Sequence, residues 1–187
     1  CDLLFLYAPT SDITDDEKTI IEKYLSDGGK VYLILGDTTS DTPNLDGIMS
    51  DYGLKKVSGY IADTQRCYQG NYYAIFPQLS LSGDLGSGIS NQMVLLLNSP
   101  GMEKTDTDND NLTVTPFMQT SDSGYAVTEN DQTQGQYILG AVSTNAISAD
   151  SSDSDSEDED DKSDATDTDT KTARLPVLAS ASMISSD

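Results

Sequence analysis

Two cysteines and 32 carboxylates are the residues that could do covalent or acid–base chemistry, because the chain of 187 residues contains no histidine. Without an imidazole, a Ser-His-Asp triad, a Cys-His pair and a histidine-based metal site are excluded. Cys67 lies in the segment TQRCYQG, which has neither the sharp glycine-flanked turn nor the base that a nucleophile needs. Cys1 and Cys67 could pair, but two ordinary thiols are expected.

The carboxylates form no spacing typical of a defined site. Residues 106–111 (DTDNDN) imitate the first half of a calcium-binding EF-hand loop, but the twelfth position is Phe117 instead of a bidentate glutamate. Residues 83–88 are glycine-rich without the order of a dinucleotide or P-loop motif. We therefore expect no metal and no cofactor. A hydrolase that uses two carboxylates stays open as an alternative, since the sequence does not reveal which acids converge.

The charge of the chain limits its partners. Ten basic residues against 32 acidic ones give a net charge of −22, which opposes binding to nucleic acids. Residues 150–172 form an acidic low-complexity segment with 11 acids and 2 lysines. No apolar run reaches the roughly 20 residues of a membrane-spanning helix. Because the chain starts at Cys1 inside an apolar run, we expect a domain cut from a longer protein.

The elements that would position a site follow a βαβ pattern. Residues 3–7 (LLFLY) form a continuous apolar run, which is typical of a strand covered on both faces in a parallel sheet. Thr14 and Glu17 have the spacing of a capping box, and Gly28 with Gly29 provides a helix stop before a second apolar strand over residues 31–35. This predicts one βαβ unit.

A second unit follows, with Pro43 at the first helical position and a strand expected over residues 56–62. Beyond it we expect an aromatic-rich loop, a short helix and four more strands, over residues 63–80, 83–90, 93–97, 112–118, 136–143 and 175–180. The prediction is one α/β domain over residues 1–187: a three-layer, mixed, mainly parallel sheet with helices on both faces and an antiparallel C-terminal pair. The acidic segment would be an overgrown hairpin loop.

Two groups of residues are candidates for binding. In open α/β sheets, ligands gather at the carboxyl ends of the strands, which here present Thr10, Ser11, Asp37, Thr38, Asp63 and Thr64. The alternative is that these residues serve as helix caps and turns. In the aromatic-rich loop, Tyr68, Tyr72 and Tyr73 could form a platform for a carbohydrate or a peptide, or could pack the loop onto the sheet.

Short segments occur along the chain in the order that a known family shows. The N-terminal ones are residues 2–9 (DLLFLYAP), 24–30 (YLSDGGK) and 31–37 (VYLILGD), and the later ones are residues 43–45, 52–54, 115–121, 135–142 and 174–182. In this order the chain resembles the GldG-like family, the auxiliary component of an ABC-type transport system associated with gliding motility. The acidic segment departs from the family's pattern, and it lies between the last two expected strands.

The resemblance implies a fold related to the class I glutamine amidotransferase-like, Rossmann-like layout. It also implies an extracytoplasmic domain that is anchored in the membrane by helices outside this sequence, beside an ABC permease and an ATPase. It carries over no catalytic residue. The function expected is therefore a non-enzymatic auxiliary domain that binds a partner protein or ligand. The alternatives are a carbohydrate- or peptide-binding module that uses the aromatic loop and, less favoured, the carboxylate-based hydrolase.

Overall fold

The computed structural model describes residues 1–36, 41–81, 93–147 and 171–183. Strands predominate over helices in it. In chain order the elements are β1 (Leu4–Tyr7), α1 (Asp15–Ser26), β2 (Val31–Ile34), α2 (Pro43–Asp51), β3 (Leu54–Val57), β4 (Tyr60–Asp63), β5 (Cys67–Tyr68), β6 (Asn71–Ile75), β7 (Gln78–Leu79), β8 (Leu96–Leu97), β9 (Gly101–Lys104), β10 (Leu112–Gln119), β11 (Gly124–Val127), β12 (Gln132–Gln134), β13 (Ile138–Ile147), β14 (Lys171–Leu178) and the 3-10 helix η1 (Ala181–Met183).

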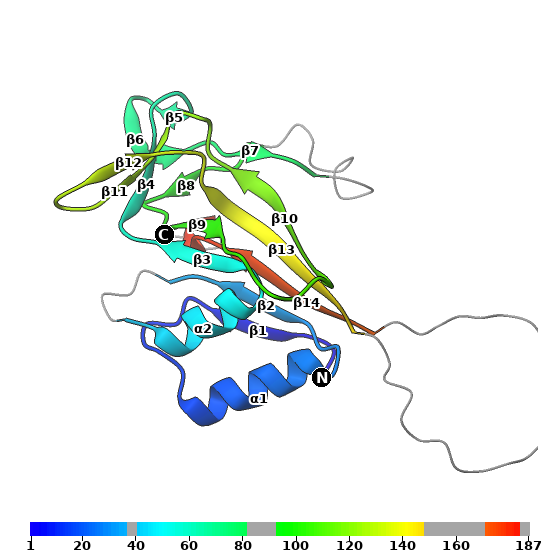
Figure 1. Ribbon diagram of the computed structural model, residues 1–187. Coiled ribbons are helices and arrows are strands. Elements are labelled where there is room, and N and C mark those ends of the chain that lie inside the picture. The colour runs from blue at the N-terminus through cyan, green and yellow to red at the C-terminus, as the bar shows by residue number, and fades with distance from the viewer. Residues whose placement is uncertain (37–40, 82–92, 148–170, 184–187) are drawn as a thin grey trace, which may run out of the picture.

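The largest sheet has the strand order β1-β2-β14-β13-β10-β7, and β9 pairs with both β13 and β3. Pairing is parallel from β1 through β2 to β14 and antiparallel from β14 through β13 and β10 to β7. Two smaller antiparallel sheets in the described chain have the orders β12-β11-β4 and β5-β6-β8. They lie at the end of the molecule away from α1 (Figure 1).

The predicted fold class is wrong. Within the described residues, parallel pairing is confined to β1, β2 and β14, and the rest of the sheets is antiparallel. Both α1 and α2 lie on the same side of the large sheet and contact each other, so no α-helix of the described ranges covers the other face (Figure 1). The apolar run at residues 3–7 misled the prediction, because the side chains of β1 alternate between partly buried and exposed. Both kinds of position carry apolar residues.

The two predicted helices are present, and local chemistry explains their starts. The backbone N–H of Glu17 donates to the Thr14 hydroxyl (3.3 Å), and the N–H of Thr14 donates to the Glu17 carboxylate (2.8 Å). These bonds complete a capping box at the start of α1. Gly28 at φ +88° follows its last turn. Pro43 begins α2, where the missing proline N–H costs nothing.

The strand expected over residues 56–62 is instead two strands that belong to different sheets. β3 pairs with β9, and β4 pairs with β11. Gly59 turns the chain between them at φ +85°, a conformation that glycine adopts without strain. The strand expected over residues 93–97 is reduced to β8, and the short helix expected over residues 83–90 falls outside the described residues.

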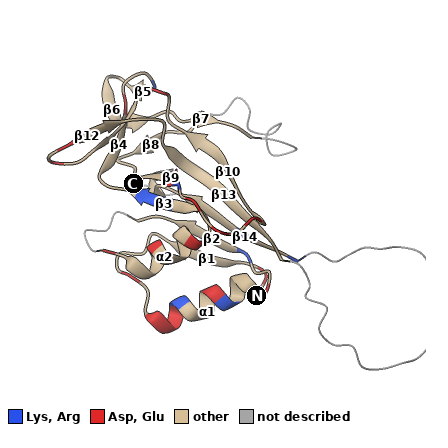
Figure 2. Cartoon of the chain, viewed as in Figure 1, with Lys and Arg blue, Asp and Glu red and all other residues tan. Residues whose placement is uncertain are grey.

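The C-terminal pair is antiparallel, as expected: β13 pairs with β14 from Gly140↔Leu178 to Ile147↔Lys171. Residues 148–170, which include most of the acidic segment over 150–172, follow β13 in the sequence and lie outside the described residues. The core fills the space between the helices and the large sheet and continues into the small sheets. Its largest fully buried side chains include Leu25, Leu33, Met49, Leu139 and Leu175. In the described chain, acidic side chains outnumber basic ones, notably on α1 (Figure 2). None of the described helices has the length and apolar character needed to cross a membrane.

Candidate ligand-binding site

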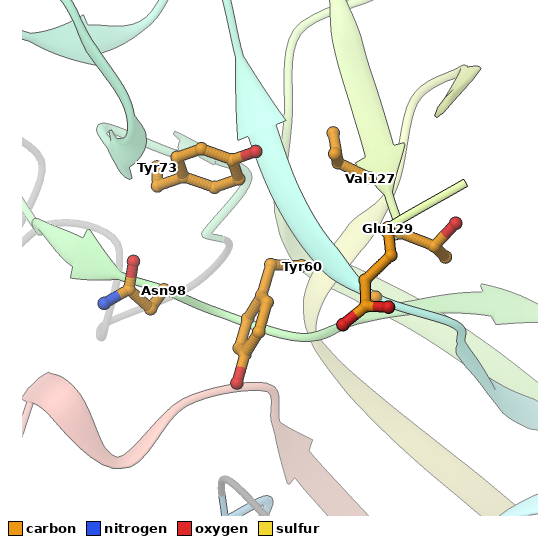
Figure 3. Close-up of a pocket in the computed structure, with 7 residues that line it drawn as sticks. Tyr60, Tyr73, Asn98, Val127 and Glu129 are labelled. Atoms are coloured by element: carbon orange, nitrogen blue, oxygen red, sulfur yellow. The ribbon is translucent and has the colours of Figure 1, made fainter. Parts of the chain in front are cut away.

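An open pocket of about 580 Å³ lies where the small sheets meet the β3–β4 turn, and its walls are mostly apolar. Figure 3 shows two tyrosine rings, an amide and a carboxylate around it. The residues that line it are Gly59, Tyr60, Tyr73, Asn98, Val127, Thr128 and Glu129. They come from segments far apart in the sequence, so tertiary pairing alone brings them together.

Backbone pairing fixes the walls of this pocket. Tyr60 starts β4 opposite Val127 at the end of β11. On the other side, the backbone N–H of Asn98 donates to the carbonyl of Tyr73 (3.0 Å), which joins the end of β8 to β6. Gly59 closes the turn beneath β11, and any Cβ at this position would collide with the carbonyl oxygen of Val127. The site therefore depends on a glycine that no larger residue can replace without moving a strand.

The chemistry of the pocket combines aromatic faces with one negative charge. Tyr60 and Tyr73 are 38% and 36% exposed, so each presents part of its ring to solvent. The Glu129 carboxylate lies on the Tyr60 side of the pocket (Figure 3). Among the described residues that line the pocket, none is basic and Glu129 is the single acid. Such a site offers stacking and cation–π contacts with a carboxylate acceptor.

Asp63, a predicted binding residue, is fully buried at the far end of β4 from Tyr60. Its Oδ1 accepts from the N–H groups of Gln65 and Arg66 (both 2.9 Å) and from the Ser121 hydroxyl (2.8 Å), while Oδ2 accepts from the Ser121 N–H (2.7 Å). Burial by itself would raise the pKa of Asp63, but the bonds from Ser121, Arg66 and Gln65 outweigh it and hold the pKa below its ordinary value. The carboxylate fastens β4 to the turn before β11.

The other residues predicted at strand ends do not gather at one edge. Thr10 and Ser11 are exposed after β1, whereas Asp37 and Thr38 lie outside the described residues. Thr64 follows β4, which belongs to another sheet, and its hydroxyl donates to the Ser123 carbonyl (3.3 Å). The expected convergence required β1, β2 and β4 to share one parallel sheet. Because β4 pairs with β11 instead, Asp63 and Thr64 are not part of the β1 and β2 edge.

The three tyrosines of the expected platform are also separated. Tyr72 and Tyr73 are neighbours on β6, and consecutive residues of a strand point to opposite faces. Tyr68 packs edge-to-face against Phe76, with 6.0 Å between ring centroids. Of the three, Tyr73 lines the pocket, together with Tyr60. Sequence reasoning did not identify Tyr60 as a candidate. The only local signal for it was the Ser58–Gly59 pair, which reads as a turn immediately before Tyr60.

Other features considered in the sequence have structural explanations here. Cys1 and Cys67 are free thiols. In the segment that imitates an EF-hand loop, the Asn109 side chain accepts from the Asn111 N–H (3.0 Å) and donates to Asn145 of β13 (3.2 Å). These bonds dock the loop onto the sheet. Within the described residues, no three cysteine or acidic side chains are placed to hold one metal ion.

Comparison with known proteins identifies a similar fold. No protein-family model and no curated protein matches this sequence. A solved structure described as "mmIFT52 N-terminal domain" superimposes with a TM-score of 0.59 at 13% sequence identity, over 99% of this chain and 68% of that one. At this identity the likeness is one of fold alone. A strand-rich domain of this kind is thus an architecture that another protein shares.

Proposed function

We propose that this chain is a non-catalytic binding domain, and that the tyrosine pocket receives a cationic side chain of a partner peptide. The observation that carries the proposal is the pairing of two partly exposed tyrosines with one carboxylate in a pocket that contains no basic residue among its described walls. A tyrosine ring face attracts a lysine or arginine cation by about 0.5–2 kcal/mol, depending on desolvation. Glu129 adds a charge of the opposite sign to such a ligand.

The charge of the whole chain supports the same ligand class. A net charge of −22 produces a negative potential that concentrates cations near the surface and accelerates their association at low ionic strength. The pocket does not resemble the site of the alternative hydrolase. That mechanism needs two carboxylates about 5–9.5 Å apart across the substrate, whereas Glu129 is the one acid among the described lining residues.

The resemblance to the GldG-like family suggests the setting in which such binding would operate. We propose that the domain is an auxiliary part of an ABC-type transport system, on the extracytoplasmic side of the membrane, with the permease and ATPase subunits as partners. Crosslinking of the full-length protein in its host, followed by affinity purification, should recover those subunits. Their repeated absence would contradict this setting without affecting the pocket proposal.

Binding to the pocket can be measured directly by NMR titration of the labelled chain with short lysine- and arginine-containing peptides. The expected result is chemical-shift changes at Tyr60, Tyr73 and Glu129. Tyr73→Ala should weaken binding about two- to thirtyfold, which is the cation–π range converted at 1.4 kcal/mol per factor of ten. Glu129→Gln should weaken it about two- to fivefold, as expected for loss of an exposed ion pair. Tyr72→Ala is the matched control, because Tyr72 is an exposed tyrosine on the same strand that does not line the pocket.

Two results would refute the cationic ligand. One is an equal loss of binding in the Tyr72→Ala and Tyr73→Ala variants, because binding would then not be at the pocket. The other is binding of neutral oligosaccharides that depends on Tyr73 but not on Glu129. This second result would favour the carbohydrate-binding alternative, since sugars stack on aromatic rings without needing a counter-charge.

A further inference from the structure

Part of one face of the large sheet, around β1 and β2, is not covered by any described residue and carries large apolar side chains. On β1, Leu4 and Leu6 point toward the core, while Phe5 and Tyr7 on the other face are 51% and 47% exposed; Leu3, just before the strand, is 50% exposed. The rings of Phe5 and Tyr7 stack with centroids 6.2 Å apart, and Phe5 lies 5.5 Å from the ring of Tyr32 on β2. Contiguous exposed apolar side chains of this kind mark interaction sites more often than single ones do.

Strand register extends this face across the sheet. Phe5 pairs with Tyr32, and the β14–β2 register places Pro176 beside Tyr32. Pro176 in turn pairs with Val142 of β13. These four residues form a row across four strands, which we call the apolar row. All four are exposed or partly exposed. Further along the strands the face closes, since Ile34 and Leu178 are buried.

A second row on the same face is basic. Lys30 precedes β2 and forms a parallel bridge with Arg174 of β14, and both are two positions from the apolar row along their strands. Both side chains are exposed. Residues two apart on a strand lie on the same face, about 6.6 Å from each other. Lys30 and Arg174 therefore stand directly beside the apolar row.

These two cations are unusual in a chain with a net charge of −22. Four lysines form ion pairs with acids, in the pairs Lys18–Glu22, Lys23–Asp27, Lys55–Glu103 and Lys56–Asp46. Lys104 and Arg66 donate to backbone carbonyls. In the described part of the chain, the side chains of Lys30, Arg174 and Lys171 have neither kind of partner. Lys171 is three positions from Arg174 on β14 and so lies on the opposite face of the sheet. The open face thus offers two unpaired positive charges next to aromatic rings.

We propose that this face is the docking surface for an acidic amphipathic helix of a partner protein. All-parallel sheets are almost always covered on both faces; in the parallel part of this mixed sheet, the described helices α1 and α2 lie on a single face (Figure 1). A helix is the usual cover of parallel strands. Its pitch of about 5.4 Å is close to the row spacing of about 6.6 Å. Apolar residues on one turn would pack on Phe5, Tyr7 and Tyr32, and carboxylates on the next turn would face Lys30 and Arg174.

The test is selection from a displayed library of amphipathic helices, with leucine fixed on one side and Glu, Lys, Gln or Ser varied beside it. Against the whole chain, Glu should be enriched over Lys at the flanking positions. The double variant Lys30→Glu/Arg174→Glu should reverse this preference. A selected peptide should bind it at least tenfold more weakly than the parent. In the parent, the peptide should shift the amide signals of Phe5, Tyr7 and Tyr32.

The matched control is Lys23→Glu/Lys55→Glu, which changes the net charge equally. Both lysines are exposed, and each already pairs with an acid away from the open face. This control should retain the Glu preference. Because the four substituted residues are exposed, we expect both double variants to fold. Circular dichroism can confirm this before selection.

Five outcomes would overturn the proposal. The first is that the library gives no binder, and the second is that its binders show no preference for Glu at the flanking positions. The third is that the preference for Glu survives in the Lys30→Glu/Arg174→Glu variant. The fourth is self-association in sedimentation experiments that Phe5→Ser abolishes, which would identify a second copy of the chain as the occupant. The fifth is that deletion of residues 151–168 creates peptide binding that the whole chain lacks, which would identify the chain's own acidic segment as the occupant. None of these results bears on the tyrosine pocket, which is probed with cationic peptides and the Tyr73→Ala variant.

Discussion

Replacing Asp63 with asparagine should destabilise the domain by about 2–3 kcal/mol. The asparagine carbonyl can keep the bonds at Oδ1, but its NH₂ group would replace Oδ2 and face the N–H of Ser121, which now donates over 2.7 Å. Leaving one buried N–H without an acceptor costs about 1–3 kcal/mol, and bonds to a neutral acceptor are weaker than bonds to a carboxylate. Such a loss is large against a total of about 5–15 kcal/mol for a domain.

The same substitution should change how stability depends on pH. Because hydrogen bonds hold the pKa of Asp63 below its ordinary value of 3.8, the carboxylate binds fewer protons in the folded state than in the unfolded state. Its contribution is present in full above the ordinary value and is lost as pH falls through the lower pKa of the folded state. Asp63→Asn removes this titration, so its stability should fall less steeply than that of the parent below about pH 4.

Urea unfolding monitored by circular dichroism, at neutral pH and then in steps from pH 5 to pH 2.5, measures both effects. Asp122→Asn is the control, because Asp122 lies in the same turn as Ser121 but is exposed. We expect it to change the free energy of unfolding by less than about 0.5 kcal/mol. Equal losses in the two variants, or an unchanged acid slope in Asp63→Asn, would refute the role assigned to the buried carboxylate.

Three further substitutions test other parts of the fold by the same unfolding measurement. Thr14→Ala should cost about 1 kcal/mol by removing the cap of α1, whereas Thr14→Ser keeps the hydroxyl and should cost little; equal effects would exclude the capping box. Gly59→Ala should cost about 1–3 kcal/mol, because Gly59 has φ +85° and a Cβ would strike the Val127 carbonyl. The same variant should also bind cationic peptides more weakly. Unchanged stability and unchanged binding would show that the turn is more adaptable. Leu175→Ala should cost about 2–5 kcal/mol, since Leu175 is fully buried. Its control is Ile20→Ala, which should change the stability by less than about 0.5 kcal/mol because Ile20 is 67% exposed. Similar losses in the two variants would place Leu175 outside the core.

Local elements were predictable where the chemistry is local. The start of α1 follows from Thr14 and Glu17, because a capping box needs a partner only three residues away. The start of α2 follows from Pro43, because the fixed φ and missing N–H of proline suit the first helical position. Both helices are present at these positions. The antiparallel pairing of the last two long strands was also expected, and β13 and β14 form it.

The candidate site was predictable only in part. Tyr73 was among the candidates, but Tyr60, Asn98 and Glu129 were not. Nothing in a sequence shows that β4, β6 and β11 meet, because their pairing depends on contacts between residues far apart along the chain. Asp63 shows the converse case. Its position after an apolar run is typical of a binding loop, yet its carboxylate is fully buried and held by the backbone of Ser121.

The sequence by itself determined the starts of α1 and α2, the strong negative charge and the exclusion of imidazole chemistry, since these depend on residue types and on neighbours within one or two turns. Only the tertiary structure decided which strands pair in parallel, which face of the large sheet stays open and which side chains share a pocket. The physical reason is that an apolar run such as residues 3–7 suits a strand buried on both faces and a strand buried on one. The choice between them rests on whether another part of the chain packs against Phe5 and Tyr7, and in this fold α1 and α2 pack on the opposite face.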